Sequence, residues 1–254
     1  MTFDVAAEAY DGFMGRYYTM PLAPVFADAA KIPTGGRVLD VGCGTGALTR
    51  VLIDRFGPDQ VAGVDPSVSF VAAAAERFPW TDIRHGAAEA LPFDDDTFDA
   101  TLAQLVVHFM TDAAAGVREM IRVTRPGGIV AACVWDFAGH RAPHSVFFDV
   151  LTSVADGIDD QSGRVGVQGG DLPTLLRDAG CVDVTETEVT VTAGYSGFDE
   201  WWSSYRLGVA PAGRQLAALS ESDRERVRTR CAELFPSGPF TIVATAWSAR
   251  GLAP

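Results

Sequence analysis

The chain has 254 residues, with 20 basic and 33 acidic residues and a formal net charge of −13. A chain of this length can form one large α/β domain, or a core domain that carries an insertion. The negative field repels phosphate backbones and no dense run of lysine and arginine offsets it, so we expect no nucleic-acid partner or substrate.

The first part of the chain combines an aromatic N-terminal helix with a regular strand–helix alternation. Residues 8–30 have a helical pattern, which Pro21 and Pro24 are expected to break. Between residues 37 and 136 strands alternate with helices, which predicts a parallel sheet with helices on both faces. The expected strands are residues 37–41, 60–64, 82–85, 98–107 and 129–135, and the expected helices are residues 47–56, 66–78 and 112–124.

After residue 136 the pattern loosens. Residues 137–170 hold glycines and two histidines without a clear period, which indicates a loop-rich insertion. The later expected elements are a helix at 172–179, an alternating strand at 184–191, helices within 198–235 and a closing strand at 241–247. Two late strands around a helical stretch would let the last strand enter antiparallel at the edge of the sheet.

The cysteine spacing and the N-terminal sequence indicate the expected cellular compartment. Four widely spaced cysteines without a Cys-x-x-Cys pair indicate buried thiols in a reducing compartment. The acidic N-terminus lacks the apolar core of a signal peptide. No stretch approaches the roughly 18 apolar residues that cross a bilayer. We therefore expect a soluble cytoplasmic protein without membrane contact, as a monomer or a homodimer.

The most informative segment is residues 38–46, Val-Leu-Asp-Val-Gly-Cys-Gly-Thr-Gly. It predicts a short buried strand, a turn through Gly42, Gly44 and Gly46, and a helix N-terminus, which together form a cradle for a nucleotide-type cofactor. The spacing of the first two glycines satisfies the permissive dinucleotide fingerprint. Asp65 lies about twenty residues farther on, where such folds place an acid on ribose hydroxyls. One interpretation of the turn is therefore that the chain is an NAD(P)-dependent oxidoreductase.

Three observations favour a cationic ligand over a dinucleotide. Asp40 precedes the turn by two residues, and a carboxylate there suits an ammonium group better than a pyrophosphate. Gly46 adds a third glycine beyond what the dinucleotide turn requires. The chain also lacks the second mononucleotide-binding half that a dinucleotide uses.

Four segments follow one another in the order of a known family: residues 38–46, 61–67, 86–99 and 125–128. They resemble motif I, the second segment, the adenine-side loop and the turn before the fifth strand of the class I S-adenosylmethionine-dependent methyltransferases. The chain is most similar to the small-molecule group of the ubiquinone-biosynthesis type (type 11), over roughly residues 37–136. The resemblance implies a doubly wound, Rossmann-like α/β sheet of seven strands, the last antiparallel, with a helical cap insertion.

The resemblance also implies a domain organisation and an activity. Residues 1–36 would be an N-terminal helical segment over the cofactor cleft, and residues 37–136 the S-adenosylmethionine-binding core. Residues 137–254 would complete the sheet and carry the substrate cap, formed by 137–170 and 198–238. The implied reaction moves a methyl group to O, N or C of a small, apolar or aromatic metabolite. A cofactor-binding protein without transfer chemistry is the non-enzymatic alternative.

The family's cofactor contacts transfer first to the glycine turn and two acids. The three glycines would let the backbone pass under the methionine and ribose parts of S-adenosylmethionine. Asp40 would order the amino group through the turn. Asp65 would accept hydrogen bonds from both ribose hydroxyls, for which a carboxylate has the right geometry.

The remaining implied contacts surround the adenine and the methionine end. Pro66 and Ser67 would flank the adenine, and Ala88 and Glu89 would read its edge. The residue before Ala88 is alanine where many relatives have aspartate, so main-chain contacts would have to substitute there. Gln104 would touch the amino-acid end of the cofactor. Tyr10 and Arg16 of the N-terminal segment would lie near that end, unless the segment only covers apolar surface.

The histidines are the candidates for acid–base or metal chemistry. A base is needed only if the acceptor must lose a proton, and His108, just past the fourth strand, is the best placed candidate. A histidine satisfied by local packing is the favoured alternative. His140 and His144 have a spacing that can bind zinc on a helix, but Pro143 and the lack of a third ligand argue against it. We expect no metal.

Four aromatic residues in the second half of the chain admit two interpretations. Phe198, Trp201, Trp202 and Tyr205 could line an apolar acceptor pocket in the cap. They could equally be the core of that cap.

Overall fold

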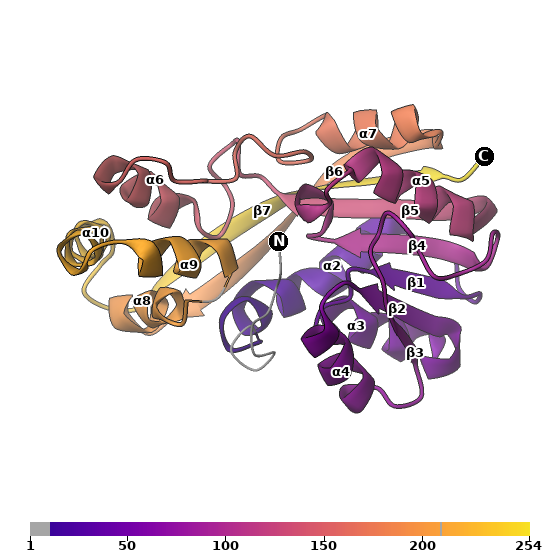
Figure 1. Cartoon of the computed structure of the whole chain (residues 1–254), viewed down its shortest axis with the longest axis horizontal. Coiled ribbons are helices and arrows are strands. Elements are labelled where there is room, and N and C mark those ends of the chain that lie inside the picture. Colours follow the sequence, from indigo (N-terminus) through magenta and orange to yellow (C-terminus); the bar gives the residue numbers. More distant parts are fainter. Residues whose placement is uncertain (1–10, 209) are drawn as a thin grey trace.

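A seven-stranded sheet is the frame of the computed structural model, which describes residues 11–208 and 210–254. Its strands are β1 (Val38–Val41), β2 (Val61–Asp65), β3 (Asp82–His85), β4 (Phe98–Gln104), β5 (Thr124–Trp135), β6 (Val182–Tyr195) and β7 (Phe240–Leu252). They lie in the order β3-β2-β1-β4-β5-β7-β6 (Figure 1). Strands β1 to β5 pair in parallel, and β7 pairs antiparallel with both neighbours. The predicted mixed sheet with an antiparallel last strand is confirmed.

The expected place of the last strand at the sheet edge is wrong. One side of β7 pairs with β5, and the other pairs with β6 along most of the length of that strand. Strand β6 therefore forms the edge. Its first half is rich in exposed threonine and glutamate, which suits an edge, whereas β7 buries the small residues Ala244, Ala246 and Ala249.

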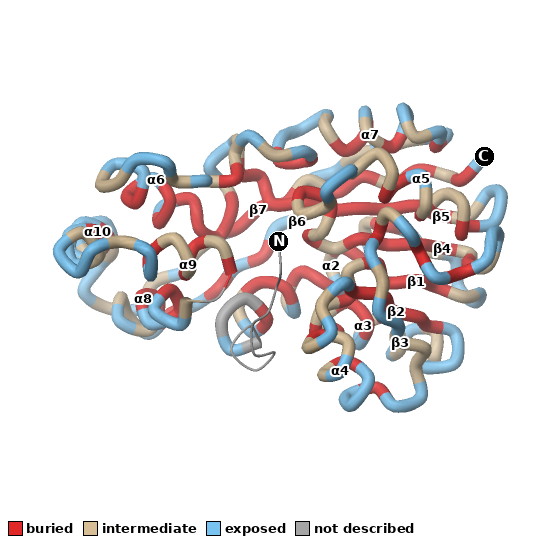
Figure 2. The backbone as a smooth tube through the Cα atoms, in the orientation of Figure 1, coloured by how far each residue is buried: buried red, intermediate tan, exposed pale blue. Residues whose placement is uncertain are grey.

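The sheet is covered by helices on both faces, as expected for a doubly wound fold. The covering helices are α2 (Met20–Ala30), α3 (Ala47–Phe56), α4 (Val68–Arg77), α5 (Ala113–Val123) and α7 (Asp171–Ala179). The other helices of the described residues are α6 (Ser145–Val154), α8 (Phe198–Arg206), α9 (Ala210–Ala218) and α10 (Glu221–Leu234). Helices α2 and α3 pack together, and α5 and α7 pack together. Buried backbone follows β1, β4 and β5 through the centre of the molecule (Figure 2). No helix in the described ranges is long and apolar enough to cross a membrane.

Several element bounds differ from the sequence prediction for local reasons. The prolines do not break the N-terminal helix: a π-helix, η1 (Asp11–Thr19), leads directly into α2, which also contains Pro24. The first turn of α2 tolerates Pro21 because proline lacks the N–H that would have no intrahelical partner at that position. Residues 8–10 lie outside the described ranges. Helix α4 is capped by Ser67, whose hydroxyl accepts from the amide of Phe70 at 3.4 Å.

Two strand ends and the insertion also depart from the expectation. Strand β4 stops at Gln104, because Leu105 has a positive φ of 60° and the chain then forms a 3-10 helix, η3 (Val107–Phe109). Strand β5 begins at Thr124, before the Pro-Gly-Gly turn that was expected to precede it. The insertion at 137–170 is less loop-rich than predicted, since it contains α6.

Helices α6, α8, α9 and α10 form a unit at one end of the sheet, which we call the cap (Figure 1). Its interior is aromatic: the rings of Phe147 and Tyr205 stack with centroids 4.0 Å apart, and Trp201 lies 4.6 Å from Phe235. Trp201 and Tyr205 are each 1% exposed. Trp201 and Tyr205 are therefore core residues of the cap, whereas Phe198 is half-buried at its border. Trp202 and Tyr205 also border an open cleft within the cap.

Candidate functional site

A cavity of about 260 Å³ opens at the carboxyl ends of β1, β2 and β4, where ligands bind in doubly wound sheets. We call it the first cavity. It brings together seven of the residues expected from the sequence: Gly42, Gly44, Asp65, Pro66, Ala88, Glu89 and Gln104. Its remaining lining residues were not anticipated: Phe70, Ala87, Leu105, Val106, Phe109, Met110 and Thr111. Most of these directly follow β4, so the position of that strand end was a usable signal.

The glycine turn shapes one wall of the first cavity. The amides of Gly42 and Cys43 both donate to the carbonyl of Val64, at 2.7 and 3.0 Å, which fixes the turn to β2. A Cβ on Gly42 would lie 2.4 Å from Val106 Cγ2, so that glycine is required by packing. At Gly44 a Cβ would meet no described atom within 4 Å. This open space lets a ligand approach the backbone closely.

Gly46 serves packing in this structure. Its φ is +95°, and a Cβ there would lie 2.2 Å from Phe78 Cε2. Gly46 is not among the described residues that line the first cavity. The third glycine, which the sequence suggested as a ligand contact, therefore allows the start of α3 to pack against the ring of Phe78.

Asp65 is held rigidly at the end of β2. Its Oδ2 accepts from the amide of Gly44 at 2.9 Å, and its Oδ1 accepts from the amide of Ser67 at 2.8 Å. Burial raises the pKa of this carboxyl, and the two amide hydrogen bonds oppose that rise. Each carboxylate oxygen has a second lone pair. The carboxylate can therefore still accept from two hydroxyls of a ligand.

Gln104 presents an unused acceptor to the first cavity. Its Nε2 donates to the backbone carbonyl of Thr19 at 3.0 Å, which fixes the orientation of the amide. Its Oε1 is buried and has no hydrogen-bond partner among the described residues. A buried acceptor without a donor is unfavourable, so this atom fits a ligand with an ammonium or hydroxyl group.

Besides Gly46, three further residues expected in the cofactor site do not line the first cavity in the described part of the chain: Asp40, Ser67 and Arg16. Asp40 is buried behind the turn and accepts from the hydroxyl of Thr49 at 2.6 Å, so it orders the first turn of α3. Arg16 is exposed and lies 5.4 Å from the ring centroid of Tyr17. Tyr10 lies outside the described residues.

Burial raises the pKa of Asp40 to about 7. The hydrogen bond from Thr49 opposes this rise, and the nearby negative charge of Asp65 adds to it. Between about pH 3.8 and pH 7, the folded chain binds a proton on Asp40 more tightly than the unfolded chain does. The free energy of unfolding of the native chain therefore falls as the pH rises through this range. We expect the stability of Asp40→Asn relative to the native chain to increase from about pH 4 to pH 8. Urea denaturation across that range measures it. A similar trend in the surface variant Asp59→Asn would contradict this origin.

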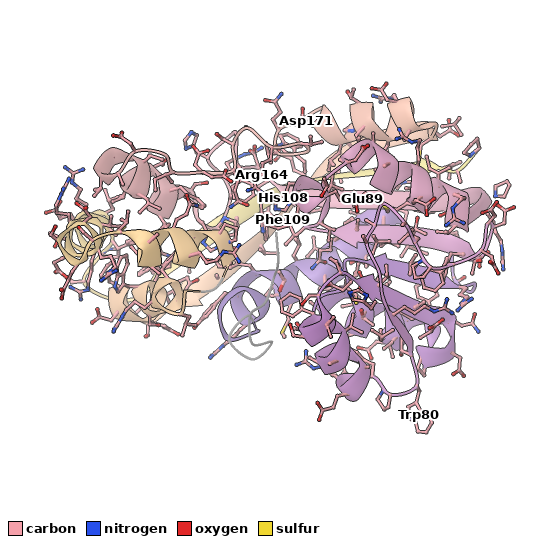
Figure 3. The ribbon with its side chains drawn as sticks, viewed as in Figure 1. Trp80, Glu89, His108, Phe109, Arg164 and Asp171 are labelled. Atoms are coloured by element: carbon pink, nitrogen blue, oxygen red, sulfur yellow. The ribbon has the colours of Figure 1, made fainter. Side chains whose placement is uncertain are left out.

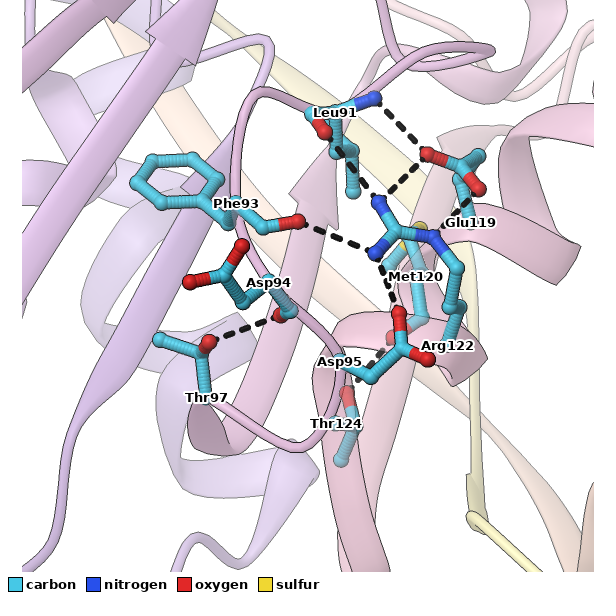
Figure 4. A network of polar contacts seen from close by, with 9 residues as sticks. All are labelled: Leu91, Phe93, Asp94, Asp95, Thr97, Glu119, Met120, Arg122 and Thr124. Atoms are coloured by element: carbon cyan, nitrogen blue, oxygen red, sulfur yellow. Dashed lines mark hydrogen bonds and ion pairs between the residues drawn. The ribbon is translucent and has the colours of Figure 1, made fainter.

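A network around Arg122 supports the outer wall of the first cavity (Figure 4). The guanidinium donates to the carbonyls of Leu91 and Phe93, at 3.1 and 2.9 Å, and pairs with Asp95 and Glu119. It thereby fastens the loop after β3 to α5.

The carboxylate of Glu89 has a structural partner in this wall. Its Oε1 accepts from the amides of Thr111 and Asp112, at 2.7 and 3.3 Å. Glu89 therefore joins the loop after β3 to the start of α5, in addition to lining the cavity.

A second cavity, of about 50 Å³, lies next to the first and shares Leu105 and Phe109 with it. Its full lining is Leu105, His108, Phe109, Trp135, Phe137, His144, Gln161, Ala210, Pro211 and Ala212. Figure 3 shows His108 and Phe109 near the junction of the sheet and the cap. Trp201 and Trp202 are not among the lining residues. This smaller cavity is therefore formed by η3, the end of β5, the insertion and the start of α9.

His108, the candidate base, borders this second cavity. Burial lowers the pKa of its imidazole to about 3, with Arg164 acting in the same direction and Asp159 opposing it. His144 is also buried there and shares a hydrogen bond with Tyr205 at 3.0 Å, whereas His140 is exposed and contacts Asp149. The two histidines thus have separate partners. Within the described ranges, no group of three or more metal-ligating side chains occurs.

Comparisons with known proteins identify the family. The family described as methyltransferase domain matches residues 39–132. A demethylmenaquinone methyltransferase of Roseiflexus castenholzii is 37% identical over 177 residues, which cover 61% of this chain and 72% of that protein. An uncharacterized methyltransferase of Mycobacterium tuberculosis is 41% identical over 141 residues, which cover 56% of this chain and 54% of that protein. The chain thus spans about half the length of the mycobacterial relative.

A solved structure extends the similarity beyond the core. A phosphoethanolamine N-methyltransferase of Haemonchus contortus, in complex with S-adenosylhomocysteine, has a TM-score of 0.60 at 17% identity and covers 98% of this chain and 57% of its own. At this identity the likeness concerns the fold. Sequence family, sheet topology and the glycine turn agree: the chain belongs to the class I S-adenosylmethionine-dependent methyltransferases, in the type 11 group.

Proposed function

We propose that this methyltransferase acts on O, N or C of a small, apolar or aromatic molecule. One observation carries the proposal: a mainly apolar second cavity shares Leu105 and Phe109 with the first cavity. A methyl acceptor that inserts one end there would border the cofactor across Leu105 and Phe109. The name of the Roseiflexus relative, a demethylmenaquinone methyltransferase, agrees with an acceptor of this kind.

The cofactor residues follow from the contacts of the first cavity. Asp65 would accept from the ribose hydroxyls, and the Oε1 of Gln104 would accept from the ammonium group. Gly44 would let the cofactor approach the turn, while Pro66 and Phe70 would flank the adenine. When bound, S-adenosylmethionine supplies a methyl group already activated by a positive sulfur. Asp40, Gly46 and Ser67 would support the turn and the adjoining helices from behind.

The chain's own contribution to transfer would be orientation and exclusion of water. His108 is neutral at neutral pH because its pKa is about 3, so it is a weak base. It would accept a proton only from a group that methylation has made strongly acidic. The catalytic role of His108 is thereby limited to a late proton transfer.

The domain organisation expected from the sequence is part of the proposal. Residues 1–36 would close over the core formed by 37–136, and 137–254 would complete the sheet and carry the cap. Two contacts between the N-terminal segment and the core support this: Gln104 Nε2 donates to the carbonyl of Thr19 at 3.0 Å, and the guanidinium of Arg55 donates to the carbonyl of Pro24 at 3.2 Å. We also propose a cytoplasmic location, consistent with four buried free cysteines, with no nucleic-acid partner and as a monomer or homodimer.

A turnover assay tests the proposed acceptor class. The native chain is incubated with methyl-labelled S-adenosylmethionine and a panel of phenols, quinols, amines and carboxylates. We expect labelled product from at least one small aromatic member and none from tRNA or from a protein mixture. Labelling of the macromolecules alone would contradict the proposal. If S-adenosylhomocysteine binds but nothing is labelled, the non-catalytic alternative replaces it.

A further inference from the structure

Three residues that line the second cavity each carry a buried polar atom without a hydrogen-bond partner in the described part of the chain. These atoms are His108 Nδ1, Trp135 Nε1 and Gln161 Oε1. The three residues are 6%, 2% and 3% exposed. A buried polar group without a hydrogen-bond partner is unfavourable, and such groups are rare in native proteins. Three of them around one small cavity indicate that a polar group binds there.

Backbone strain occurs at the same place. Gln161 has a φ of 68° and Leu105 a φ of 60°, a region that residues with large side chains rarely adopt. Leu105 forms the wall between the two cavities, and Gln161 belongs to the insertion. Strained residues persist where the surroundings hold them, and they concentrate at ligand sites. The strain therefore agrees with the unpartnered atoms in marking this cavity.

The segment that carries Gln161 is fastened to the wall of the first cavity. The amide of Gln161 donates to Asp159 Oδ1 at 2.9 Å, and Asp159 forms an ion pair with Arg164. Arg164 donates to the carbonyl of His108 at 3.3 Å and lies 5.5 Å from the ring centroid of Phe109 (Figure 3). The backbone at Gln161 is thus fixed to the wall that the two cavities share.

The second cavity has the chemistry of a site for a neutral group. Its lining contains no aspartate, glutamate, lysine or arginine among the described residues, and burial lowers the pKa of both His108 and His144 to about 3. A carboxylate or ammonium group would lie there without a counter-charge, which is costly. A neutral hydroxyl group suits the cavity, since its O–H can donate a hydrogen bond to Gln161 Oε1 and its oxygen can accept one from the indole N–H of Trp135.

We propose that the second cavity holds the hydroxyl-bearing end of a neutral aromatic or enolic methyl acceptor, and that Gln161 and Trp135 select this group. The inference rests on the proposed function and names its substrate class. The cavity of about 50 Å³ has room for the hydroxyl and the ring edge that bears it, and the rest of the ring would lie against Leu105 and Phe109, toward the first cavity. Gln161 and Trp135 would act as specificity-determining residues, separate from the residues that hold the cofactor.

Calorimetric titration tests the inference without any turnover. The protein is saturated with S-adenosylhomocysteine and titrated at about pH 7 with three probes: 1-naphthol, 1-methoxynaphthalene, which has no hydroxyl proton, and 1-naphthoate, which is charged. We expect 1-naphthol to bind about tenfold tighter than either analogue, which corresponds to one buried hydrogen bond. Equal affinities for the three probes would overturn the assignment and leave the cavity as a water site.

Two variants identify the residues responsible. Gln161→Leu keeps the approximate shape and removes the acceptor, and Trp135→Phe keeps a ring and removes the donor. Each should reduce the affinity for 1-naphthol about tenfold and leave that for S-adenosylhomocysteine within about twofold. Gln168→Leu, an exposed position of the same insertion, is the matched control. Unchanged 1-naphthol binding in both variants would overturn the inference, whereas absence of S-adenosylhomocysteine binding by the native chain would instead contradict the proposed cofactor site.

Discussion

Replacement of Asp65 by alanine is expected to weaken binding of S-adenosylhomocysteine about 100-fold or more. The carboxylate stands at the end of β2 with each oxygen fixed by one backbone amide and one lone pair free. Each charge-assisted hydrogen bond to a ribose hydroxyl contributes roughly 1.5–3 kcal/mol. Two such bonds exceed about 2.8 kcal/mol, which is about 100-fold in affinity. Titration calorimetry of the native and variant chains measures the difference.

Two controls separate binding from folding in this experiment. Asp65→Asn keeps one carbonyl oxygen and should lose less affinity than the alanine variant. Asp59→Ala changes an exposed aspartate just before β2 and should bind as the native chain does. Urea denaturation of each variant reports the loss of the two amide contacts. If Asp65→Ala binds S-adenosylhomocysteine with native affinity, Asp65 is not the ribose ligand.

The second large effect is expected at Gly44. A methyl group at Gly44 would meet no described atom within 4 Å, so Gly44→Ala fills the space reserved for the ligand rather than the protein core. We expect loss of S-adenosylhomocysteine affinity of about 100-fold, with a stability cost of only about 1–2 kcal/mol for a positive φ. Calorimetry and urea denaturation on the same preparation give both quantities.

Gly46 is the matched comparison, because it lies in the same turn and faces a different environment. Gly46→Ala would bring a Cβ within 2.2 Å of the Phe78 ring at a φ of +95°. Its stability should fall by roughly 2–5 kcal/mol through overpacking and backbone strain. The protein that remains folded should bind S-adenosylhomocysteine better than Gly44→Ala does. The opposite ranking of the two variants, in binding or in stability, would contradict this division of roles.

The strand–helix core was largely predictable because its signals are local. Helix α3 begins and ends where the glycines on both sides indicate, and the caps at Asp112 and Ser220 mark the starts of α5 and α10. The place of β7 was not predictable in this way. Pairing between strands far apart in sequence depends on which face and edge the whole fold leaves open, and no local period records that.

The same distinction between local signals and long-range contacts applies to the residues of the candidate site. The turn and Asp65 were found because a strand end, a glycine spacing and an acid follow one another within a short segment. The orientation of Asp40 was missed, since all four residues of β1 are buried and burial alone does not tell which neighbour a side chain contacts. The second cavity was missed because Trp135 and Gln161 are brought together by the tertiary fold, and Gln161 belongs to a segment without periodicity.

The insertion of β7 between β5 and β6 has a consequence for biogenesis. During synthesis the parallel strands β1 to β5 are complete well before residues 240–252 emerge, so the outer edge of β5 has no partner in that interval. An uncovered edge can pair with another chain, and distant strand pairing is slow because a long loop must close first. Refolding of this enzyme should therefore be limited by docking of the antiparallel β6–β7 pair, and nascent chains that stall before β7 should be those most prone to aggregate.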